Sequence, residues 1–319
     1  MFHRSLVVVA LATLVSACGG GGATSSQTSF ATPTPTPVPT STPFAGPQYL
    51  YVAKTSPPSG IMQYALPLTA SSMPNFTLPF DNVRSLAFDA SGDLAAADST
   101  GHVKFFPPPL SATSTPAVSF NTGTGFAGIA AFNGAGDLFV TAANGVNVFA
   151  HPFTSASTPS AFITAPSIRS SFALAFDAAQ NLYVAADTGK MSLLVFAPPY
   201  SGTPVITPGV DVVTPYESIA VSANQVIAPA LHLPGRVDVY GLPLTAASTP
   251  NAAIESGSGG INGPNSVALD AAGNLYVMNT GNGSVTVYSL PIPTGGGLPT
   301  VTLQMPAGTF NFWGIAVGR

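Results

Sequence analysis

The sequence predicts an all-β protein whose main domain is a six-bladed β-propeller closed by pairing of its N- and C-terminal segments. Three observations support this fold. A block of short alternating strands recurs about six times, the blocks are spaced by 44 to 48 residues, and the two ends of the repeated region are complementary parts of one block. Repeats of this length with four short strands each are typical of propeller blades.

The clearest copy of the block covers residues 266–289. It contains three alternating runs, Val267–Leu269, Leu275–Met278 and Val285–Tyr288, separated by Asp-Ala-Ala-Gly-Asn and Asn-Thr-Gly-Asn-Gly. Glycine and asparagine tolerate positive φ and are typical of tight turns between strands. Each block is therefore expected to begin with a three-stranded antiparallel meander.

The first, innermost strand of each block contains an alanine at a constant place. A small side chain is expected there, because inner strands crowd together around a central channel. A proline-rich run is interpreted as the fourth, outer strand, at Leu66–Pro74 in one block and Leu242–Pro250 in another. Proline is tolerated on edge strands because they lack a full hydrogen-bond ladder. The recurring alanines are Ala87, Ala131, Ala175, Ala220, Ala268 and Ala316.

The ends of the repeated region complete each other. The region opens with a second-strand match, Tyr49–Ala53, and closes with an inner strand, Gly314–Val317. Joined, they would form one blade beside five continuous blades. This pairing would close the ring and remove two exposed strand edges.

Residues 1–17 are predicted to be a lipoprotein signal peptide. Arg4 precedes an apolar run, Ser5–Leu14, which is too short for a transmembrane helix. The next residues, Val15 to Cys18, resemble a bacterial lipobox, in which cleavage precedes the cysteine and its thiol is acylated. Cys18 is the only cysteine, so no disulfide can form within the chain. The alternative is an ordinary secretion signal with a cysteine there by chance.

Residues 18–47 are predicted to be a disordered linker, and residues 48–319 the propeller. The linker contains Gly19–Gly22 and the Thr-Pro alternation of Ala31–Pro43, which favours an extended polyproline II stalk. Gly19 stands where an aspartate commonly marks inner-membrane retention. We therefore expect a lipid-anchored protein of the bacterial cell envelope, at the outer membrane or cell surface.

The repeats resemble NHL-repeat propellers, and Leu275–Asn279 followed by Val285–Tyr288 also resembles the related YVTN repeats. The resemblance covers residues 48–319 and implies the fold. Propellers host binding modules, lactonases and lyases on one scaffold, so the fold does not assign a function. With 6% charged residues and a net charge of −4, the chain also lacks the basic surface that nucleic-acid binding requires.

One face of the ring is predicted to carry a ligand site. The loops before the inner strands and between the second and third strands share this face, and most of the rare charges fall in them. The alternative is that loops simply tolerate charge. Aspartates in the opposite turns, such as Asp89 and Asp270, are expected to cap those turns. The candidate ligand-binding residues are Arg84, Arg169, Tyr216, Glu217, Asn265, Trp313, His102 and His232.

A catalytic or metal set is not evident in the sequence. Gluconolactonase-like propellers hold a divalent cation with carboxylate and asparagine ligands that begin inner strands. Only Glu217 and Asn265 would suit that role, and Arg84 would repel a cation. His102 and His232 are possible bases without an apparent carboxylate partner. The corresponding junctions here are Arg84, Ala127, Ser171, Glu217, Asn265 and Trp313.

We therefore expect a binding module without catalysis, cofactor or bound metal, which acts as a monomer. Its expected partners are the membrane, through acylated Cys18, and an envelope protein, a glycan or a small anionic ligand near Arg84 and Trp313. The alternative is a lactonase- or lyase-type enzyme with a divalent metal over the channel. A further alternative is a structural or adhesive envelope protein that self-associates.

Overall fold

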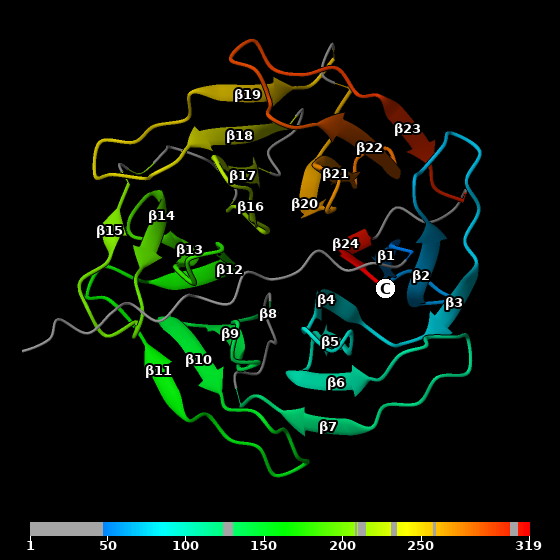
Figure 1. Cartoon of the computed structure of the whole chain (residues 1–319), viewed down its shortest axis with the longest axis horizontal. Helices are drawn as coiled ribbons and strands as arrows, with labels where there is room; N and C mark the ends of the chain where they lie inside the picture. Colours follow the sequence, from blue (N-terminus) through cyan, green and yellow to red (C-terminus); the bar gives the residue numbers. More distant parts are fainter. Residues whose placement is uncertain are drawn as a thin grey trace, which may run out of the picture. The chain divides into compact units, whose positions relative to one another are not determined.

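The computed structural model describes residues 47–123, 130–207, 209, 215–230, 235–257, 260–306 and 312–319. These residues form six four-stranded sheets arranged as blades of a ring, a six-bladed β-propeller (Figure 1). In this part of the chain no helix is long and apolar enough to cross a membrane. The predicted signal peptide, Cys18 and the linker up to Gly46 lie outside the described residues.

Within each blade the strands are antiparallel and run from the channel outwards in a fixed order. Blade 1 comprises β4 (Val83–Phe88), β5 (Leu94–Asp98), β6 (His102–Phe106) and β7 (Val118–Asn121). Blade 2 comprises β8 (Ala130–Phe132), β9 (Leu138–Ala142), β10 (Gly145–Phe149) and β11 (Ala161–Ile163), and blade 3 comprises β12 (Ser170–Phe176), β13 (Leu182–Asp187), β14 (Met191–Phe196) and β15 (Val205–Ile206). Blade 4 comprises β16 (Ala220–Val221), β17 (Gln225–Ala230), β18 (Arg236–Gly241) and β19 (Ala252–Glu255), and blade 5 comprises β20 (Pro264–Leu269), β21 (Asn274–Asn279), β22 (Ser284–Ser289) and β23 (Val301–Gln304).

Blade 6 joins the two ends of the domain, which confirms the predicted closure. Its strand order is β24 (Phe312–Gly318), β1 (Tyr49–Lys54), β2 (Gly60–Ala65) and β3 (Phe76–Pro79). The ladder between β1 and β24 pairs Tyr51 with Ala316. The Tyr51 hydroxyl also donates a hydrogen bond to the Arg319 carbonyl oxygen at 2.5 Å. The last residue of the chain is thus held by a side chain from the first strand.

Apolar side chains fill the six interfaces between neighbouring blades. One cluster of buried residues lies at each interface; between blades 5 and 6, for example, Tyr276 packs with Leu50 and Tyr64. Full burial of one large apolar side chain contributes roughly 1.5–3 kcal/mol. The recurring alanines Ala220, Ala268 and Ala316 belong to these clusters. They lie on the innermost strands, where the blades converge and leave room for only a small side chain.

Serine side chains connect the inner strands of adjacent blades. The Ser85 hydroxyl accepts a hydrogen bond from the Ala130 N–H at 3.1 Å, and Ser266 accepts one from the Ile315 N–H at 3.1 Å. Between blades 6 and 1 the corresponding residue is Gly314, where a Cβ atom would lie only 2.8 Å from the Arg84 carbonyl oxygen. The inner strands are therefore linked directly around the axis, which fixes the positions of the residues at their ends.

The predicted position of the outer strand is wrong. The proline-rich run Leu66–Pro74 forms the connection after the third strand, and the outer strand β3 follows it. The run turns because the Thr69 N–H donates to the Ser72 hydroxyl at 2.9 Å, a local bond that competes with strand pairing. The Thr245 N–H donates to Ser248 in the same way at 2.8 Å, so Leu242–Pro250 is also a connection.

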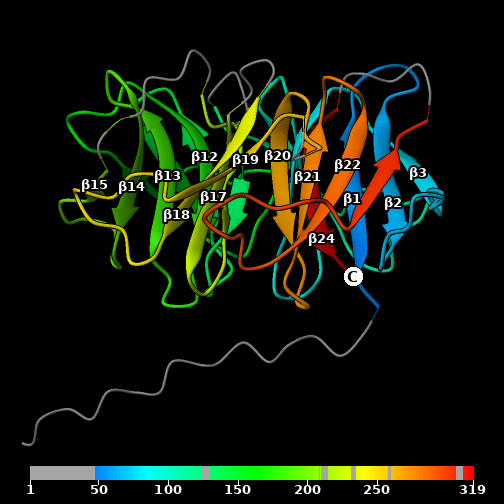
Figure 2. The same ribbon diagram turned by 90° about the horizontal axis from the view of Figure 1, so that it is seen from above.

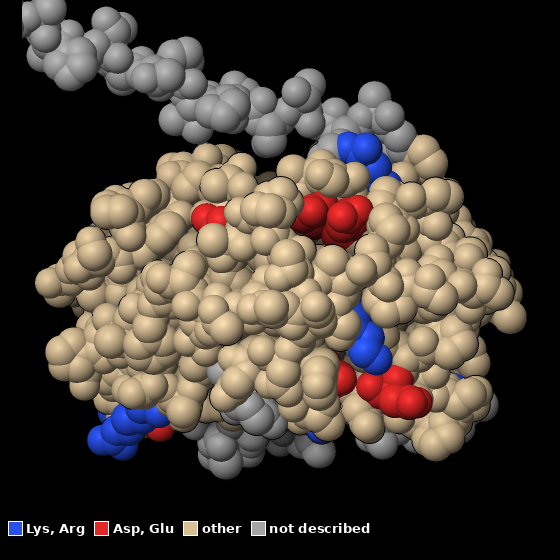
Figure 3. Space-filling model, turned by 90° about the horizontal axis from the view of Figure 1, so that it is seen from below, with Lys and Arg blue, Asp and Glu red and all other residues tan. Residues whose placement is uncertain are grey.

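The surface carries little charge. Figure 3 shows one side of the ring as almost continuous uncharged residues, with small separate groups of acidic and basic residues. Among the described residues the exposed large apolar side chains, including Met73 and Leu298, are few. Solubility of this surface therefore depends on serine, threonine, asparagine and backbone groups.

Candidate functional site

The strands run between two faces of the ring, as the side view shows (Figure 2). We call one the turn face; it carries the turns that join each first strand to the second. The other is the channel face, which carries the residues that precede each inner strand and the hairpins between second and third strands. The turn face repeats its polar residues in several blades, whereas the channel face carries different residues in each blade.

The turn face repeats one capping arrangement. In blade 5 the Asp270 carboxylate accepts hydrogen bonds from the N–H groups of Ala272 and Asn274, at 3.0 and 2.8 Å, and from the Tyr276 hydroxyl at 2.8 Å. Asp89 and Asp177 accept equivalent backbone bonds in blades 1 and 3. These aspartates are turn caps, as predicted. Blade 2 uses Asn133 at this position, and Asp137 instead accepts a bond from its amide group at 3.0 Å.

The channel face carries a register shift at the start of several inner strands. The ladder skips one residue in each of β4, β12 and β20, and skips two in β24. Such a β-bulge re-aims a side chain and is common next to functional sites. The skipped residues are Arg84, Phe172, Asn265 and, in β24, Trp313 with Gly314.

One junction residue differs from the prediction. In blade 3 the equivalent of Arg84 is Phe172, whereas Ser171 is paired with Ala186 in the ladder. The Ser171 hydroxyl is hydrogen-bonded to the backbone of blade 2, to the Gly145 carbonyl oxygen at 2.6 Å. Ala127, the residue assigned to blade 2, lies outside the described residues. Phe172 precedes the recurring Ala175 by three residues, as Arg84 precedes Ala87, so the spacing from the alanine was the signal that could have identified it.

Arg84 and Trp313 are in direct contact, which confirms the predicted neighbourhood. The guanidinium carbon lies 3.8 Å from the centre of the Trp313 ring. Blades 1 and 6 are neighbours, and β4 and β24 contact each other along the channel. A cation on an aromatic face is attracted by about 0.5–1 kcal/mol when exposed and more when desolvated. The amide group of Asn265, in blade 5, also donates to the Trp313 carbonyl oxygen at 3.5 Å.

Glu217 lies in blade 4, opposite blade 1, and interacts electrostatically with Arg84. Burial raises the pKa of the Glu217 carboxyl, and the positive charge of Arg84 offsets only part of that rise. Burial in turn lowers the pKa of Arg84, and Glu217 opposes the decrease. The two charges therefore act on one another across the ring. We call Arg84, Glu217, Asn265 and Trp313 the channel group.

Tyr216 is not a ligand-lining residue, contrary to the prediction. Its side chain is 0% exposed and belongs to the apolar cluster between blades 3 and 4. Its hydroxyl donates to the Asp238 carboxylate and is hydrogen-bonded to the Tyr240 hydroxyl at 3.1 Å. The side chain thus points into the blade, away from solvent, although it precedes Glu217 directly in the sequence.

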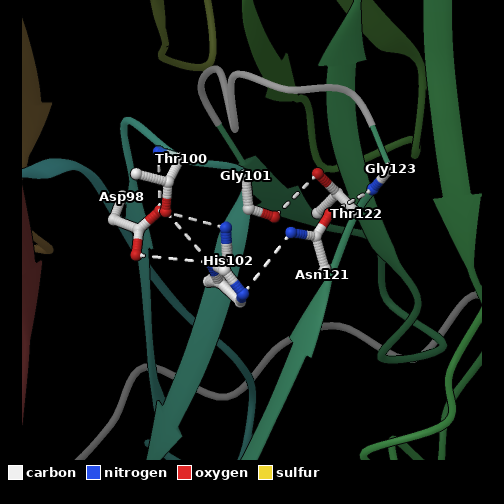
Figure 4. A network of polar contacts seen from close by, with 7 residues as sticks. All are labelled: Asp98, Thr100, Gly101, His102, Asn121, Thr122 and Gly123. Carbon is white, nitrogen blue, oxygen red and sulfur yellow. Dashed lines mark hydrogen bonds and ion pairs between the residues drawn. The ribbon is translucent and has the colours of Figure 1, made fainter.

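His102 lies in a polar network at the β5–β6 hairpin (Figure 4). Its Nδ1 atom is 3.0 Å from the Thr100 hydroxyl and 3.8 Å from Asp98 Oδ2, and its Nε2 atom is 3.4 Å from the Asn121 amide nitrogen. A carboxylate therefore does accompany this histidine, which corrects the sequence interpretation. The hairpin Asp98-Ser-Thr-Gly-His102 was the signal that could have shown it, because aspartate commonly bonds the backbone two residues on.

The hydrogen bonds of this hairpin act on Asp98. Burial by itself would raise the pKa of its carboxyl, but bonds from the Thr100 hydroxyl and from the N–H groups of His102 and Thr100, together with the imidazole, hold it below its usual value. Asp98 is thus an ionised acceptor that organises the hairpin. The described contacts of His102 are made within blade 1 and do not include the channel group.

The remaining candidates are separate from the channel group or outside the described residues. Arg169 is exposed, its N–H donates to the Asp187 carbonyl oxygen at 2.8 Å, and its guanidinium lies beside Gly189. His232 lies outside the described residues. The structure thus brings together four of the eight predicted residues: Arg84, Glu217, Asn265 and Trp313.

The channel group does not match a divalent-metal site. Within the described ranges no three His, Cys, Asp or Glu side chains are grouped as metal ligands. Glu217 is the one carboxylate in the channel group, and its electrostatic partner is the guanidinium of Arg84. A second cation beside Arg84 would be repelled, so this donor set favours chemistry performed by the side chains themselves.

No model of a known protein family matches the chain, and neither does any curated protein. Solved structures do match. A periplasmic gluconolactonase from Pseudomonas aeruginosa is 15% identical, with a TM-score of 0.57 over 81% of this chain and 83% of that one. A candidate 6-phosphogluconolactonase from Bacteroides fragilis is 10% identical, with a TM-score of 0.61 over 86% of this chain and 99% of that one. The Cps50 (Swd1) propeller domain of Myceliophteria thermophila is 11% identical, with a TM-score of 0.56 over 80% and 82% of the chains.

These similarities correct the expected function. At 10–15% identity they show the fold alone, but two of the three structures carry lactonase names. The expectation of a binding module without catalysis is therefore wrong as the first choice, and the alternative of a lactonase-type propeller has the better support. Its predicted metal is the part that the channel group does not fit.

Proposed function

We propose that this protein is a lactonase-type hydrolase that opens a cyclic ester at the channel face. The observation that carries the proposal is the pairing of Glu217, a half-buried carboxyl whose pKa is raised, with Arg84 on the opposite blade. A carboxylate with a raised pKa suits a general base, since its basicity approaches that needed near neutral pH. A guanidinium opposite it suits the negative charge that forms on a carbonyl oxygen.

The proposed reaction uses these groups in sequence. Ionised Glu217 accepts a proton from water as the water oxygen attacks the lactone carbonyl carbon, and Arg84 stabilises the resulting oxyanion. When the ring carbon–oxygen bond breaks, the ring oxygen takes the proton back from Glu217 and becomes a hydroxyl group. The product is a hydroxy acid, whose carboxyl proton is released to solvent. Trp313 holds the Arg84 guanidinium against its ring, and Asn265 supports the Trp313 backbone.

The experiment is a lactonase assay of the full chain in detergent. A panel of five- and six-membered sugar lactones is followed by acid release, with spontaneous hydrolysis subtracted. We expect the wild type to hydrolyse at least one lactone, and Glu217→Gln to lower kcat/KM by about 10²-fold or more. Glu255→Gln is the matched control, because Glu255 is an exposed carboxylate at the end of β19 in the same blade, and it should leave kcat/KM unchanged.

Two results would contradict the proposal. One is a wild-type protein that hydrolyses no lactone above the spontaneous rate. The other is a Glu217→Gln variant that keeps wild-type kcat/KM, since then another group would act as the base. Chelator treatment is included as a further arm. Because the channel group does not fit a divalent metal, activity is expected to survive chelation.

We further propose that the enzyme is a lipoprotein related to the NHL and YVTN propellers and is attached to the bacterial outer membrane or cell surface. The support is the repeat pattern, the lipobox-like residues and the single cysteine. A Thr-Pro stalk would hold the propeller away from the bilayer. Cys18→Ser should release the protein from the membrane fraction. A variant that still sediments with membranes would contradict the lipid anchor.

A further inference from the structure

Within the described part of the chain, the segment around Glu217 has few backbone bonds of its own. The inner strands β4, β12, β20 and β24 have six or seven residues each, whereas β8 has three and β16 has only two, Ala220–Val221. Residues 215–219 precede this short strand and make one isolated bridge to β17, between Tyr216 and Ala230. A regular ladder therefore does not hold the proposed base in place.

Two side chains anchor this segment: the Ser218 hydroxyl accepts a hydrogen bond from the Val267 N–H at 3.2 Å, and the Tyr216 side chain supplies the other anchor. It is fully buried, and its hydroxyl donates to Asp238 on β18 while contacting the Tyr240 hydroxyl at 3.1 Å. Phe172, the bulged residue of blade 3, packs against the same cluster. The residue next to Glu217 is thus fixed on one side by a hydrogen bond and on the other by apolar packing.

The acceptor of this bond is itself fixed. Asp238 is 0% exposed and forms an ion pair with Arg236, with 2.6 Å between the nitrogen and oxygen atoms. Burial raises the pKa of the Asp238 carboxyl, and the bonds from Tyr216 and Arg236 oppose the rise. A buried carboxylate of this kind requires its donors, and removal of one costs more than the bond itself contributes.

We infer that Tyr216 is a positioning residue, which holds Glu217 in its half-buried place opposite Arg84 through the hydrogen bond to Asp238. The inference rests on the proposed function for its consequence in catalysis. The competing explanation is that the buried network stabilises blade 4 and has no influence on Glu217. The two explanations differ in how the ionisation of Glu217 responds when the bond is removed.

Trp313 provides a readout of that ionisation without any assay of activity. It is the only tryptophan in the chain, it lies 3.8 Å from the Arg84 guanidinium, and Arg84 interacts with Glu217. Its fluorescence should therefore change as Glu217 gains or loses its proton. The test records this fluorescence against pH for the full chain in detergent. The change in fluorescence that is lost in Glu217→Gln is assigned to protonation of Glu217, and we call it the Glu217 step.

Tyr216→Phe removes the hydroxyl and keeps the ring. We expect the Glu217 step to move to lower pH by about half a unit or more, because a loosened segment lets water reach the carboxylate. The kcat for lactone hydrolysis should fall about ten- to hundredfold with little change in KM, since geometry is lost and binding is kept. Tyr240→Phe is the matched control. It removes a hydroxyl from the same buried network on β18, and should lower Tm without moving the step or kcat.

The inference is overturned if Tyr216→Phe lowers Tm but keeps the wild-type fluorescence step and kcat, or if the wild type has no step that Glu217→Gln removes. A step that moves in Tyr216→Phe while the wild type hydrolyses no lactone would support the positioning and contradict the proposed reaction. If Tyr216→Phe does not fold, Asp238→Asn replaces it. That variant keeps an acceptor but weakens the bond, and a smaller shift in the same direction is required of it.

Discussion

The turn face and the channel face are built at opposite ends of the same strands, yet they use polar residues in different ways. On the turn face, Asp89, Asp177 and Asp270 occupy equivalent positions and accept equivalent backbone bonds. On the channel face, equivalent positions hold Arg84, Phe172, Asn265 and Trp313. In a repeat protein, a residue that recurs in every unit serves the unit, whereas one that differs in each unit can serve the whole ring.

The carboxylates show the same difference. Asp270 is surrounded by donors, including the Tyr276 hydroxyl at 2.8 Å, so its charge is used to fix a turn. Glu217 is half-buried and has a guanidinium from the opposite blade as its electrostatic partner, and desolvation raises its pKa. Tyr216 and Asp238 form a third type, a buried pair that supports the segment next to Glu217. A carboxylate surrounded by hydrogen-bond donors stabilises the structure, whereas one whose pKa is raised is a candidate for proton transfer.

The largest effect is expected when the ring itself is broken. Deletion of residues 312–319 removes β24, so β1 loses its partner and two blade interfaces lose their inner residues Ile315 and Ala316. Unfolding or aggregation should follow, measured by circular dichroism and light scattering. Removal of Arg319 alone, which keeps β24, is the control. A truncated chain that melts like the full chain would show that closure of the ring does not determine stability.

Arg84→Ala should reduce lactonase activity without reducing the stability of the fold. Kcat/KM for lactone hydrolysis is expected to fall about 10²–10³-fold, because the oxyanion loses its cation. Arg84 also lowers the pKa of Glu217, so its removal should raise that pKa further and shift the acid limb of the pH–rate profile to higher pH. Tm should change little. Arg169→Ala, an exposed arginine on the same face, is the control, and an acid limb that stays in place in Arg84→Ala would argue against the pairing.

Asp270→Ala, on the turn face, should reduce stability without reducing lactonase activity. Its carboxylate accepts two backbone bonds, one from the Asn274 amide group and one from the Tyr276 hydroxyl, so we expect a loss of about 3 kcal/mol in the free energy of unfolding. Lactonase activity per folded molecule should be unchanged. Asp89→Ala removes only the backbone bonds of blade 1 and should cost about 1 kcal/mol. Equal costs for the two variants, measured by denaturant unfolding, would mean that the side-chain bonds from Tyr276 and Asn274 contribute nothing.

The smallest effect is expected from Ser85→Ala. The Ala130 N–H loses its acceptor between blades 1 and 2, and the free energy of unfolding should fall by about 1 kcal/mol. Ser91→Ala, at an exposed serine of the turn face, is the control and should be neutral. Because Ser85 follows Arg84 directly, a change in the pH–rate profile of Ser85→Ala would show that the inter-blade bonds also position the channel group.

Much of the fold followed from local sequence signals. Alternating strands, glycine and asparagine turns and a constant alanine are properties of each block, and blade closure followed from the unmatched ends at Tyr49 and Val317. The contact between Arg84 and Trp313 was also predictable, because ring order places the last inner strand beside the first. The sequence analysis placed the fourth strand in the proline-rich connection that precedes it. That connection forms a turn, because the Thr69 N–H donates to the Ser72 hydroxyl within the same run.

By itself, then, the sequence determined the repeat, the closed six-bladed ring and the capping role of the turn aspartates, since each depends on contacts within a block or on the order of blocks. Only the tertiary structure decided which polar residues act together. Burial turned the Tyr216 side chain into the blade, where its hydroxyl donates to Asp238. The pairing of Glu217 with Arg84 joins residues 133 positions apart, on opposite blades, and depends on how six sheets converge on one axis.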